Sequence, residues 1–315
     1  MQAIIFTIRW AHWPRIWGLL LLLTAMSILI LLFPRSVYSY TKLSIDGGLG
    51  NFEIKTKDDK FISDSKNSRR NISLRIDFEK DEHPLRFSFR LGFFNTGEDS
   101  EKWTKALPHE NRLQIHGENF DVLGFFTIYN FASSKGAIRL KPFIGGGLGY
   151  KRFKFERNGL DENIITPPAA GQYFLGNQDV TAIGATPHIG FLVEIPKFKL
   201  ECNVIVGWSL LAVRSNVNYH YFSGSDEVMH SVIINTSGSS LVTGIQVVRS
   251  WESFSIVLGY IWEKTWIDDK LLVKVKKIKL PDESPYDTYN RYFYFPFPEF
   301  EMIQTIGQIS LTYLF

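Results

Sequence analysis

Apolar and polar side chains alternate along much of this chain, so that every second residue is apolar. In one such stretch Phe87 and Phe89 fall on one face of an extended chain and Arg90 falls on the other. A period of two residues indicates a β-strand with one apolar and one polar face. The clearest stretches are 72–79, 85–93, 198–210 and 254–266.

Weaker alternation brings the total to about ten predicted strands, and the connections between them alternate in length. This regular sorting predicts an up-and-down antiparallel meander with both termini at the short-turn end, as in transmembrane barrels. The weaker strands are 41–55, 119–132, 138–156, 179–195 and 239–250, and the regular last strand is 306–315. The short turns are Asp81–Pro84, Ser133–Gly136, Pro196–Lys197 and Ser250–Glu252, and the long connections are 56–70, 96–118, 157–178, 214–238 and 268–300.

The two faces of these strands predict that lipid covers one of them. The apolar face carries large side chains, and the sequence offers no second sheet or helix to cover it. The polar face is charged, and charges buried without partners would cost on the order of several kcal/mol each, so they should pair or be wetted inside the barrel. The predicted interior polar network consists of Asp46, Arg75, Asp77, Glu79, Arg86, Arg90, Arg139, Lys141, His188, Glu194, Lys199, Glu201, Gln246, Glu263, Gln304 and Gln308.

Aromatic residues near the predicted strand ends suggest the two girdles that mark membrane interfaces. The alternative is that they form the core of a soluble, lipocalin-like barrel. A barrel of about ten strands has an interior that side chains largely fill, whereas water-filled porins need roughly 16–18 strands, so we expect a plugged or very narrow lumen. The aromatic residues concerned are Tyr150, Trp251, Tyr260, Trp262, Trp266 and Tyr313.

Residues 1–39 are predicted to be a secretory signal peptide. Arg9 and Arg15 form a basic start, an apolar run covers 18–33, and small or modest residues precede a cut after Ser39. An uncleaved N-terminal anchor is the alternative. Export would leave one barrel domain over residues 40–315.

Composition excludes several classes of protein. The net charge of +3 provides no concentrated basic face, so we expect no nucleic-acid binding. The single cysteine, Cys202, permits no intrachain disulfide. After residue 39 no further run of 18 apolar residues appears, which excludes helical membrane spans in that part of the chain.

The final residues resemble the C-terminal insertion signal of bacterial outer-membrane β-barrel proteins, because Ile309, Leu311, Tyr313 and Phe315 share one face. The segment Leu140–Tyr150, LKPFIGGGLGY, resembles the "P-[FY]-[IV]-G-x-G-x-G" strands of small outer-membrane barrels of the opacity-protein and OmpW-like kind. The resemblance implies an outer-membrane location and insertion by the barrel-assembly machinery. Smaller members of that family have eight strands, so this chain looks longer by a hairpin.

The glycines of this segment have a second interpretation as a phosphate-binding loop, which requires a helix directly after them. The residues that follow, from Tyr150 to Phe155, alternate as a strand does. In a barrel, glycines let a strand bend strongly in a narrow wall. We therefore interpret Gly145, Gly146, Gly147 and Gly149 as structural.

Some outer-membrane barrels are enzymes, and two kinds are relevant to this chain. Omptin-type surface proteases are also ten-stranded, with acidic pairs and an Asp–His pair at the outer rim, whereas Asp81-Glu82-His83 here falls in a predicted periplasmic turn. Barrel lipases and lipid A deacylases need a Ser–His–acid set on the lipid-facing wall, and His188 is predicted to face inward. The remaining acidic pairs lie in long connections, where solvated loops are the ordinary interpretation: Asp58-Asp59, Asp161-Glu162, Asp226-Glu227 and Asp268-Asp269.

No histidine spacing in the sequence indicates a metal site. His116 with Glu118, and His220 with His230, do not have the arrangement that metal ligands require. We therefore predict no catalytic residue, no cofactor-binding residue and no metal ligand.

The sequence thus predicts an all-β protein, a transmembrane up-and-down antiparallel barrel of about ten strands in the bacterial outer membrane. We expect a structural or surface-interaction role, with outer-membrane lipid, the barrel-assembly machinery and an extracellular ligand or surface partner as its contacts. The alternatives are a narrow channel for small or apolar solutes and a barrel enzyme. The 270–300 region is either a hairpin whose aromatic residues touch a partner or, as we favour, strand extensions above the membrane.

Overall fold

The computed structural model describes most of the chain from Tyr40 onward. The expected signal peptide and its cut after Ser39 lie outside the described residues, as do most of the turns predicted at 81–84 and 133–136. The described residues are 40–57, 62–79, 84–103, 109–133, 137–158, 173–223, 226–276, 292–297 and 299–315.

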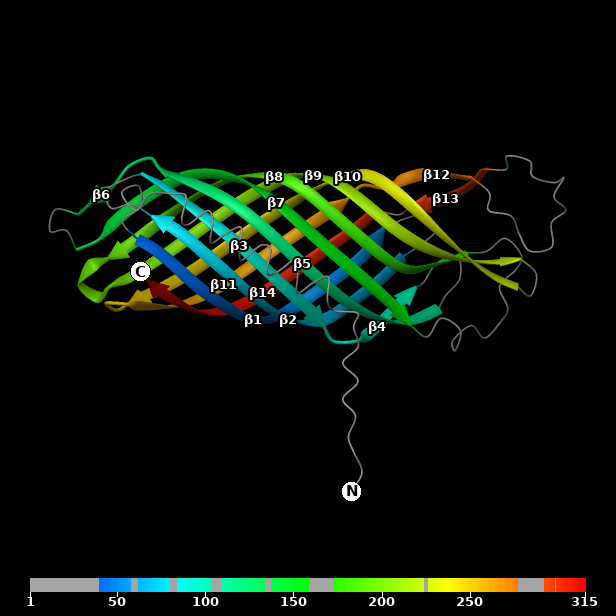
Figure 1. The fold of residues 1–315 in the computed structure, drawn as a ribbon, viewed down its shortest axis with the longest axis horizontal. Helices are drawn as coiled ribbons and strands as arrows, with labels where there is room; N and C mark the ends of the chain where they lie inside the picture. Colours follow the sequence, from blue (N-terminus) through cyan, green and yellow to red (C-terminus); the bar gives the residue numbers. More distant parts are fainter. Residues whose placement is uncertain are drawn as a thin grey trace, which may run out of the picture.

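In the described part of the chain, ten strands close into an antiparallel barrel (Figure 1). Each strand pairs with the next along the chain, which confirms the predicted all-β up-and-down barrel. In order round the wall the strands are β1 (Tyr40–Lys57), β2 (Ile62–Glu79), β3 (Leu85–Thr96), β5 (His109–Thr127), β7 (Arg139–Asn158), β8 (Tyr173–Ile195), β9 (Leu200–Ser223), β10 (Asp226–Ser250), β11 (Phe254–Ile267) and β14 (Glu299–Leu314). Shorter strands are β4 (Asp99–Trp103), β6 (Phe131–Ala132), β12 (Lys270–Lys276) and β13 (Tyr292–Phe297).

The first and last strands close the wall. Ile45 of β1 lies opposite Leu311 of β14, and the amide of Phe315 donates to the Thr41 carbonyl at 3.0 Å. Because closure pairs every barrel strand on both sides, no open sheet edge remains for lipid to cover. The apolar stripe of the final strand faces outward, and its exposed residues are Ile309, Leu311, Tyr313 and Phe315.

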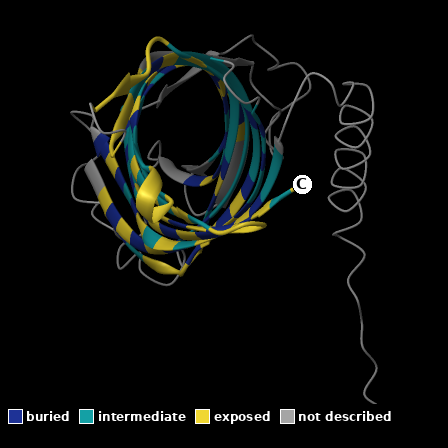
Figure 2. Ribbon diagram, turned by 90° about the vertical axis from the view of Figure 1, so that its left-hand side faces the viewer, coloured by how far each residue is buried: buried dark blue, intermediate teal, exposed yellow. Residues whose placement is uncertain are grey.

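The wall exchanges its apolar and polar faces part-way along its length. On β1, Ile45 and Leu49 are exposed on the outside while Asp46 is buried inside. Farther along the same strand, Phe52 is buried inside and Lys55 is exposed. The side chains still alternate in and out, but the chemistry of each side is reversed. We call the part with the apolar exterior the belt half and the part with the polar exterior the outer half; Figure 2 looks in from the belt end.

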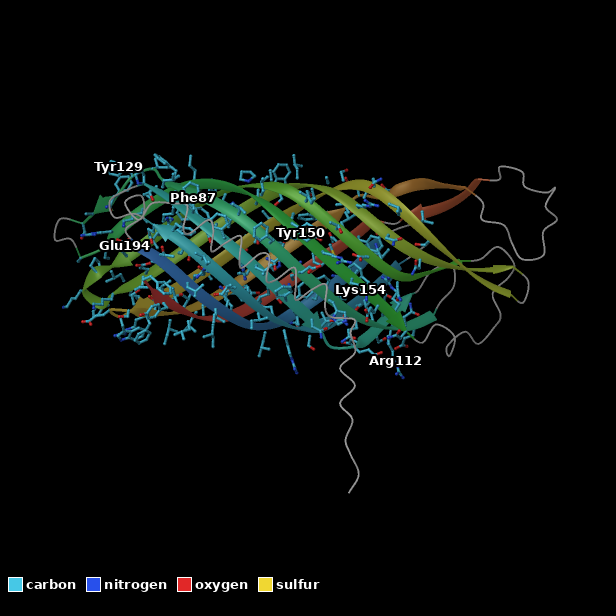
Figure 3. The ribbon with its side chains drawn as sticks, viewed as in Figure 1. Phe87, Arg112, Tyr129, Tyr150, Lys154 and Glu194 are labelled. Carbon is cyan, nitrogen blue, oxygen red and sulfur yellow. The ribbon has the colours of Figure 1, made fainter. Side chains whose placement is uncertain are left out.

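The apolar exterior has the height of a membrane. On β7 the outward residues are apolar from Leu140 to Tyr150, and the next ones are Arg152, Lys154 and Glu156 (Figure 3). A strand that rises about 3.3 Å per residue at a tilt of about 45° covers roughly 24 Å over that distance, against a band of about 25 Å in known membrane barrels. The belt half therefore spans the bilayer, and the outer half stands in water.

Aromatic residues mark the two edges of the belt. Tyr150, Tyr260 and Trp262 lie at its outer edge, and Trp251 and Tyr313 lie at the short-turn edge. One predicted girdle residue lies elsewhere. Trp266 sits beyond the belt, where its indole Nε1 donates to Glu301 Oε1 at 3.0 Å.

The outer half has an apolar core of its own. Phe52, Phe94 and Phe153 meet at its centre, with ring centroids 5.6, 5.9 and 6.0 Å apart. This core fills the barrel where an open pore would need a water-filled passage. Its other members are Ile54, Leu113, Ile115, Phe155, Val180, Ala182, Leu211, Val213, Val217, Val232, Ile234, Ile267, Phe300 and Met302.

Three predicted long connections, 56–70, 96–118 and 214–238, are wrong because strands continue through them. Strand β2 begins at Ile62 and β5 at His109, and the hairpin β9–β10 is paired as far as Ser223 and Asp226. With 24 and 25 residues, β9 and β10 far exceed the roughly 9–11 that cross a bilayer. Beyond the belt most outward residues are polar, with exceptions such as Ile233, so a search for one continuous apolar face ends too early.

Two other predicted segments differ in detail. Strand β5 ends at Thr127, and β6 is a separate two-residue strand that pairs with β7. In the 270–300 region β12 pairs with β13 in a separate two-stranded sheet, which fits both interpretations given above, while residues 277–291 lie outside the described part. No helix long and apolar enough to cross a bilayer occurs among the described residues.

Candidate functional site

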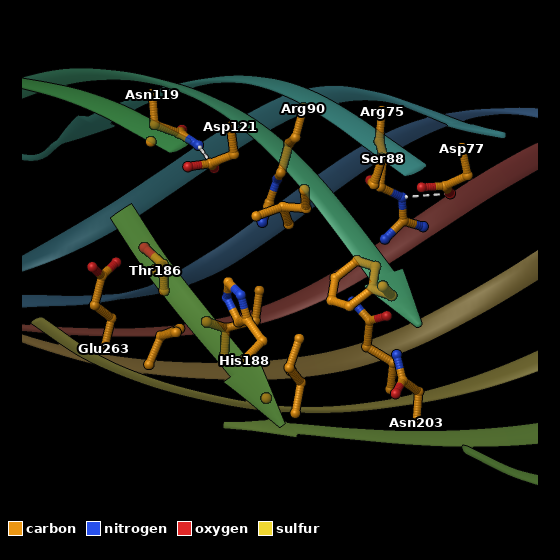
Figure 4. A pocket seen from close by; sticks show the side chains of 18 of the residues that line it. Arg75, Asp77, Ser88, Arg90, Asn119, Asp121, Thr186, His188, Asn203 and Glu263 are labelled. Atoms are coloured by element: carbon orange, nitrogen blue, oxygen red, sulfur yellow. Dashed lines mark hydrogen bonds and ion pairs between the residues drawn. The ribbon is translucent and has the colours of Figure 1, made fainter. Parts of the chain in front are cut away.

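A cavity of about 320 Å³ occupies the interior of the belt half (Figure 4). At one end it is lined by Glu79, Arg86 and Glu201, which lie at strand ends on the short-turn rim. At the other end it is lined by Phe94 and Phe153 of the apolar core. The cavity therefore faces the short-turn end of the barrel, and the core closes it toward the outer half.

Most residues of the predicted polar network lie in this interior. Asp46 is buried and accepts a hydrogen bond from the Ser73 hydroxyl at 2.9 Å, and Gln308 is buried nearby on β14. Lys141 and Glu194 form an ion pair with 2.5 Å between Nζ and Oε1. The predicted residues that line the cavity are Arg75, Asp77, Glu79, Arg86, Arg90, His188, Glu201, Gln246, Glu263 and Gln304.

Opposite charges are paired at several places in the lumen. Each contact lets one charge offset the desolvation of the other, which is the condition for burying either. The network is therefore built from local pairs. Besides Lys141–Glu194, the pairs are Lys42–Glu79 at 2.6 Å, Arg75–Asp77 at 3.2 Å and Lys151–Glu263.

Two residues that we placed in the network lie outside it. Lys199 is exposed in the turn after the 3₁₀ segment Pro196–Phe198, with a left-handed φ of 49°. Arg139 is the first residue of β7 and is exposed at the rim, opposite Glu194 in the register. Counting alternate positions fails for Lys199 because the turn before β9 resets the direction of the side chains, whereas Arg139 keeps the parity of Lys141 but is exposed at the end of its strand.

Two lysines of the interior were not predicted from the sequence. Lys42 and Lys151 both reach carboxylates in the lumen. Lys42 shares its strand parity with Asp46, and Lys151 with Lys141, so counting alternate positions along each whole strand would have found them.

The ring of His188 lies inside the barrel on β8, 6% exposed. It packs edge-on against Phe125 with 5.9 Å between the ring centroids, and its Nδ1 has no hydrogen-bond partner. Gly207 makes room for it, since a Cβ there would lie 2.5 Å from His188 Cδ2. The inward direction predicted for His188 matches its position.

The exterior of the outer half carries ion pairs in water. Arg152 donates to Asp179 at 2.9 and 2.5 Å and to Glu118 at 3.2 Å. These bonds, those to Asp179 first, raise the pKa of Arg152 above its ordinary value, so it stays charged at every working pH. His116 Nε2 lies 3.5 Å from Glu156 Oε2 on the same exterior.

The described residues include no group of three or more His, Cys, Asp or Glu side chains placed to hold a metal ion. His116 has Glu156 as its neighbour. The side chains of His220 and His230, and the acidic pairs at 58–59, 161–162 and 226–227, lie outside what the structure describes.

Comparison with known proteins identifies the fold. No protein-family model matches the chain, and no curated protein matches it in sequence. The outer membrane protease OmpT from Escherichia coli superposes with a TM-score of 0.53 at 13% identity, covering 88% of this chain and 97% of that chain. The chain folds as a small outer-membrane β-barrel.

Two further solved structures are similar to this chain, with lower scores. The Pseudomonas putida toluene transporter TodX has a TM-score of 0.30 at 8% identity and covers 87% of this chain and 89% of its own. Ail, the attachment invasion locus protein of Yersinia pestis, has a TM-score of 0.28 at 12% identity and covers 87% and 98%. The similarity to OmpT, together with the belt, confirms the predicted outer-membrane barrel.

Proposed function

We propose that this protein is a closed outer-membrane barrel whose outer half is a rigid platform for binding at the cell surface. The supporting observation is the reversal of the wall, which gives the outer half an apolar core and a polar exterior. A barrel of that kind is stable in water for the same reason as a soluble β-barrel. It lifts a binding surface beyond the membrane without depending on flexible loops.

The same core argues for a closed lumen. Phe52, Leu113 and Ile115 have no exposed surface, and the rings of Phe94 and Phe153 pack against Phe52. An ion passing through such a core would lose its hydration without finding a polar partner. On this proposal the barrel conducts no ions, which separates it from the channel alternative.

The hairpin β9–β10 is the best candidate for the binding surface. It projects far beyond the belt (Figure 1), and its described outward side chains there are mostly amides and hydroxyls, with the cation Arg214 and the apolar Ile233 among them. The Ser231 hydroxyl donates to Asn216 Oδ1 at 2.8 Å, and Asn235 and Ser237 are exposed beside them. Amides and hydroxyls both donate and accept hydrogen bonds, so a surface made mostly of them around one cation suits a hydroxyl-rich partner such as a glycan.

Conductance in planar bilayers tests the closure. Folded wild-type protein, checked by its heat-modifiable migration on a gel, is expected to give no unitary steps. The triple variant Phe52→Ala, Phe94→Ala and Phe153→Ala removes the centre of the core and shows whether a passage can open there. Unitary steps from folded wild-type protein would contradict the proposal.

Binding of a glycan array to displaying cells tests the platform. Wild-type cells should bind at least one neutral glycan, and Asn235→Arg should weaken that binding at least tenfold, because it removes an amide and places a second, like charge opposite Arg214. Asn51→Arg, which lies outward beyond the belt on β1, is the matched control and should bind as wild type. Equal losses in the two variants, or no binding above cells that lack the barrel, would refute the assignment.

A further inference from the structure

The positive charges that line the cavity in the belt half are not all paired with carboxylates. Its lysines are paired with carboxylates, as at Lys42–Glu79 and Lys151–Glu263. In contrast, no carboxylate of the described residues lies within 4.0 Å of the guanidinium of Arg86 or Arg90. Both arginines come from β3 and line the cavity.

The contacts of Arg90 leave most of its hydrogen-bonding capacity unused. Its Nε and Nη2 both approach the hydroxyl of Ser73 at 3.3 Å. Asp121 lies directly across from Arg90 in the β3–β5 register, but its carboxylate accepts from Asn119 at 3.0 Å instead. A guanidinium carries five N–H donors, so one shared hydroxyl satisfies only part of Arg90.

Arg86 is held by aromatic rings, and Glu79, which lies opposite it in the β2–β3 register, forms its ion pair with Lys42 instead. Its guanidinium carbon lies 5.3 Å from the centroid of Phe143 and 5.7 Å from that of Phe125, and its Nε has no partner. Cation–π contacts orient the guanidinium but leave its N–H groups available in the plane of the fork. Arg86 is therefore held in position while N–H donors of its guanidinium remain available to a ligand.

The opposite wall offers polar atoms that also lack partners. His188 Nδ1 and Asn203 Oδ1 are buried and unbonded, and both residues line the cavity. Figure 4 shows Arg90 directed from β3 into the space that His188 approaches from β8. A cavity of about 320 Å³ lies at the lower end of the range of small-molecule sites, so the space admits a ligand as well as water.

We propose that this cavity binds a small organic oxyanion, which enters from the periplasm and places its carboxylate or phosphate group on Arg86 and Arg90. Guanidinium forks match the geometry of both groups, and an anion would offset the desolvation of the two charges. The Phe125 ring offers an apolar surface for the rest of the ligand. The apolar core bars entry from the outer half, so the site is separate from the proposed surface platform.

A ¹⁹F NMR titration tests the site with full-length protein in detergent micelles. The probe is 4-fluorobenzoate, with inorganic phosphate as a competitor that carries the anionic group alone. We expect saturable binding of 4-fluorobenzoate and its displacement by phosphate. Phosphate that binds as tightly as 4-fluorobenzoate would show that the anionic group alone is recognised, which would overturn the role given to Phe125.

Variants decide which residues hold the anion. Arg86→Gln and Arg90→Gln should each raise the dissociation constant at least tenfold, and Arg90→Lys should fall between wild type and Arg90→Gln because it keeps the charge but loses the fork. Arg112→Gln, exposed on the outer half, is the matched control and should bind as wild type. Heat-modifiable migration on a gel shows whether each variant is folded. If one of the three arginine variants does not fold, the dissociation constants of the other two decide whether the arginines hold the anion.

Two results would overturn the proposal. The first is the absence of saturable binding of 4-fluorobenzoate to folded wild-type protein. The second is an equal dissociation constant in wild type and in the folded Arg86 or Arg90 variants, which would place the probe in the detergent or elsewhere on the barrel.

Discussion

Glu101 and Arg157 form an ion pair sealed inside the outer half of the barrel. Arg157 Nε lies 2.7 Å from Glu101 Oε2 and Nη2 lies 3.1 Å from Oε1, and both side chains are 0% exposed. Arg157 Nη1 also donates to the Gly176 carbonyl at 2.8 Å. The pair therefore ties β4 to β7 and to the start of β8.

Removing one charge of this pair should be strongly destabilising. Glu101→Gln leaves the Arg157 guanidinium buried without its counter-charge, and we expect a loss of about 3–5 kcal/mol in the free energy of unfolding. The control is Glu53→Gln, which breaks the exposed Lys66–Glu53 pair and should cost about 1 kcal/mol or less. Urea unfolding in lipid vesicles measures both. Equal losses would show that the Glu101 pair is solvated.

A close approach between β1 and β14 depends on a residue without a Cβ. At Gly50 an added Cβ would lie 1.7 Å from the Thr305 carbonyl oxygen, whereas at Gly47 it would meet nothing within 4 Å. Gly50→Ala should therefore force the two strands apart and cost about 1–3 kcal/mol or more, and Gly47→Ala should be close to neutral. The same unfolding experiment compares them, and a neutral Gly50→Ala would mean that the seam is looser than the structure shows.

The cost of a charge on the exterior should depend on depth in the belt. Ile189 lies near the middle of the apolar exterior of β8, and Ile183 lies at its outer edge opposite Tyr150. Ile189→Arg should cost about 2–4 kcal/mol, and Ile183→Arg only about 0–1 kcal/mol, because the second side chain reaches the headgroups. Unfolding in bilayers of one thickness gives both values. A smaller loss of stability for Ile189→Arg than for Ile183→Arg would show that the centre of the belt does not lie at Ile189.

Acid should weaken the exterior ion pairs of the outer half slightly. A hydrogen bond from Lys154, and then the charges of Lys154 and His116, lower the pKa of Glu156 below its ordinary value of 4.5. A carboxylate whose pKa is lower in the folded state stabilises the fold above about pH 4.5 and loses that contribution as the pH falls through the folded pKa. Because the group is substantially exposed, the contribution should be below about 1 kcal/mol.

Glu156→Gln is the measurement for this effect. The variant should lose the small part of the pH dependence of unfolding that lies below about pH 4.5 and should resemble wild type in shape above it. Asn158→Gln, a neutral change at an exposed position on the same strand, serves as the control. A variant that becomes relatively less stable in acid would reverse the predicted sign.

Sequence periodicity was sufficient to predict which residues of the belt half face outward and which face inward. One rule holds there, because apolar side chains face the lipid and polar side chains face the lumen. Ile45 out and Asp46 in, or Ile189 out and His188 in, follow from alternation plus the need to cover apolar surface with lipid. The anion site was only partly predictable. Arg86 and Arg90 were placed inside by parity, but parity does not show that the carboxylates opposite them, Glu79 and Asp121, contact Lys42 and Asn119 instead.

The outer half was missed because the same alternation carries the opposite chemistry. Asn67 and Arg69 are buried while Lys66 and Arg70 are exposed, so polar residues occupy both faces of β2 and the pattern resembles a loop. The contacts of β2 with its neighbours, such as that of Arg69 with Phe94 on β3, show that this segment is part of a wall around an apolar core. Such contacts join separate strands, and the periodicity of one strand does not report them.

The reversal of the wall can be tested most directly by measuring what surrounds two matched residues. Ile189 and Ile233 both point outward and are 62% and 53% exposed, one in the belt half and one in the outer half. Nitroxide labels at Ile189→Cys and Ile233→Cys, in a Cys202→Ala background, report collisions with oxygen and with a water-soluble nickel chelate in lipid vesicles. We predict that the label at 189 collides mainly with oxygen and the label at 233 mainly with the chelate. The same preference at both sites would contradict the division of the barrel into a lipid-covered half and a water-covered half.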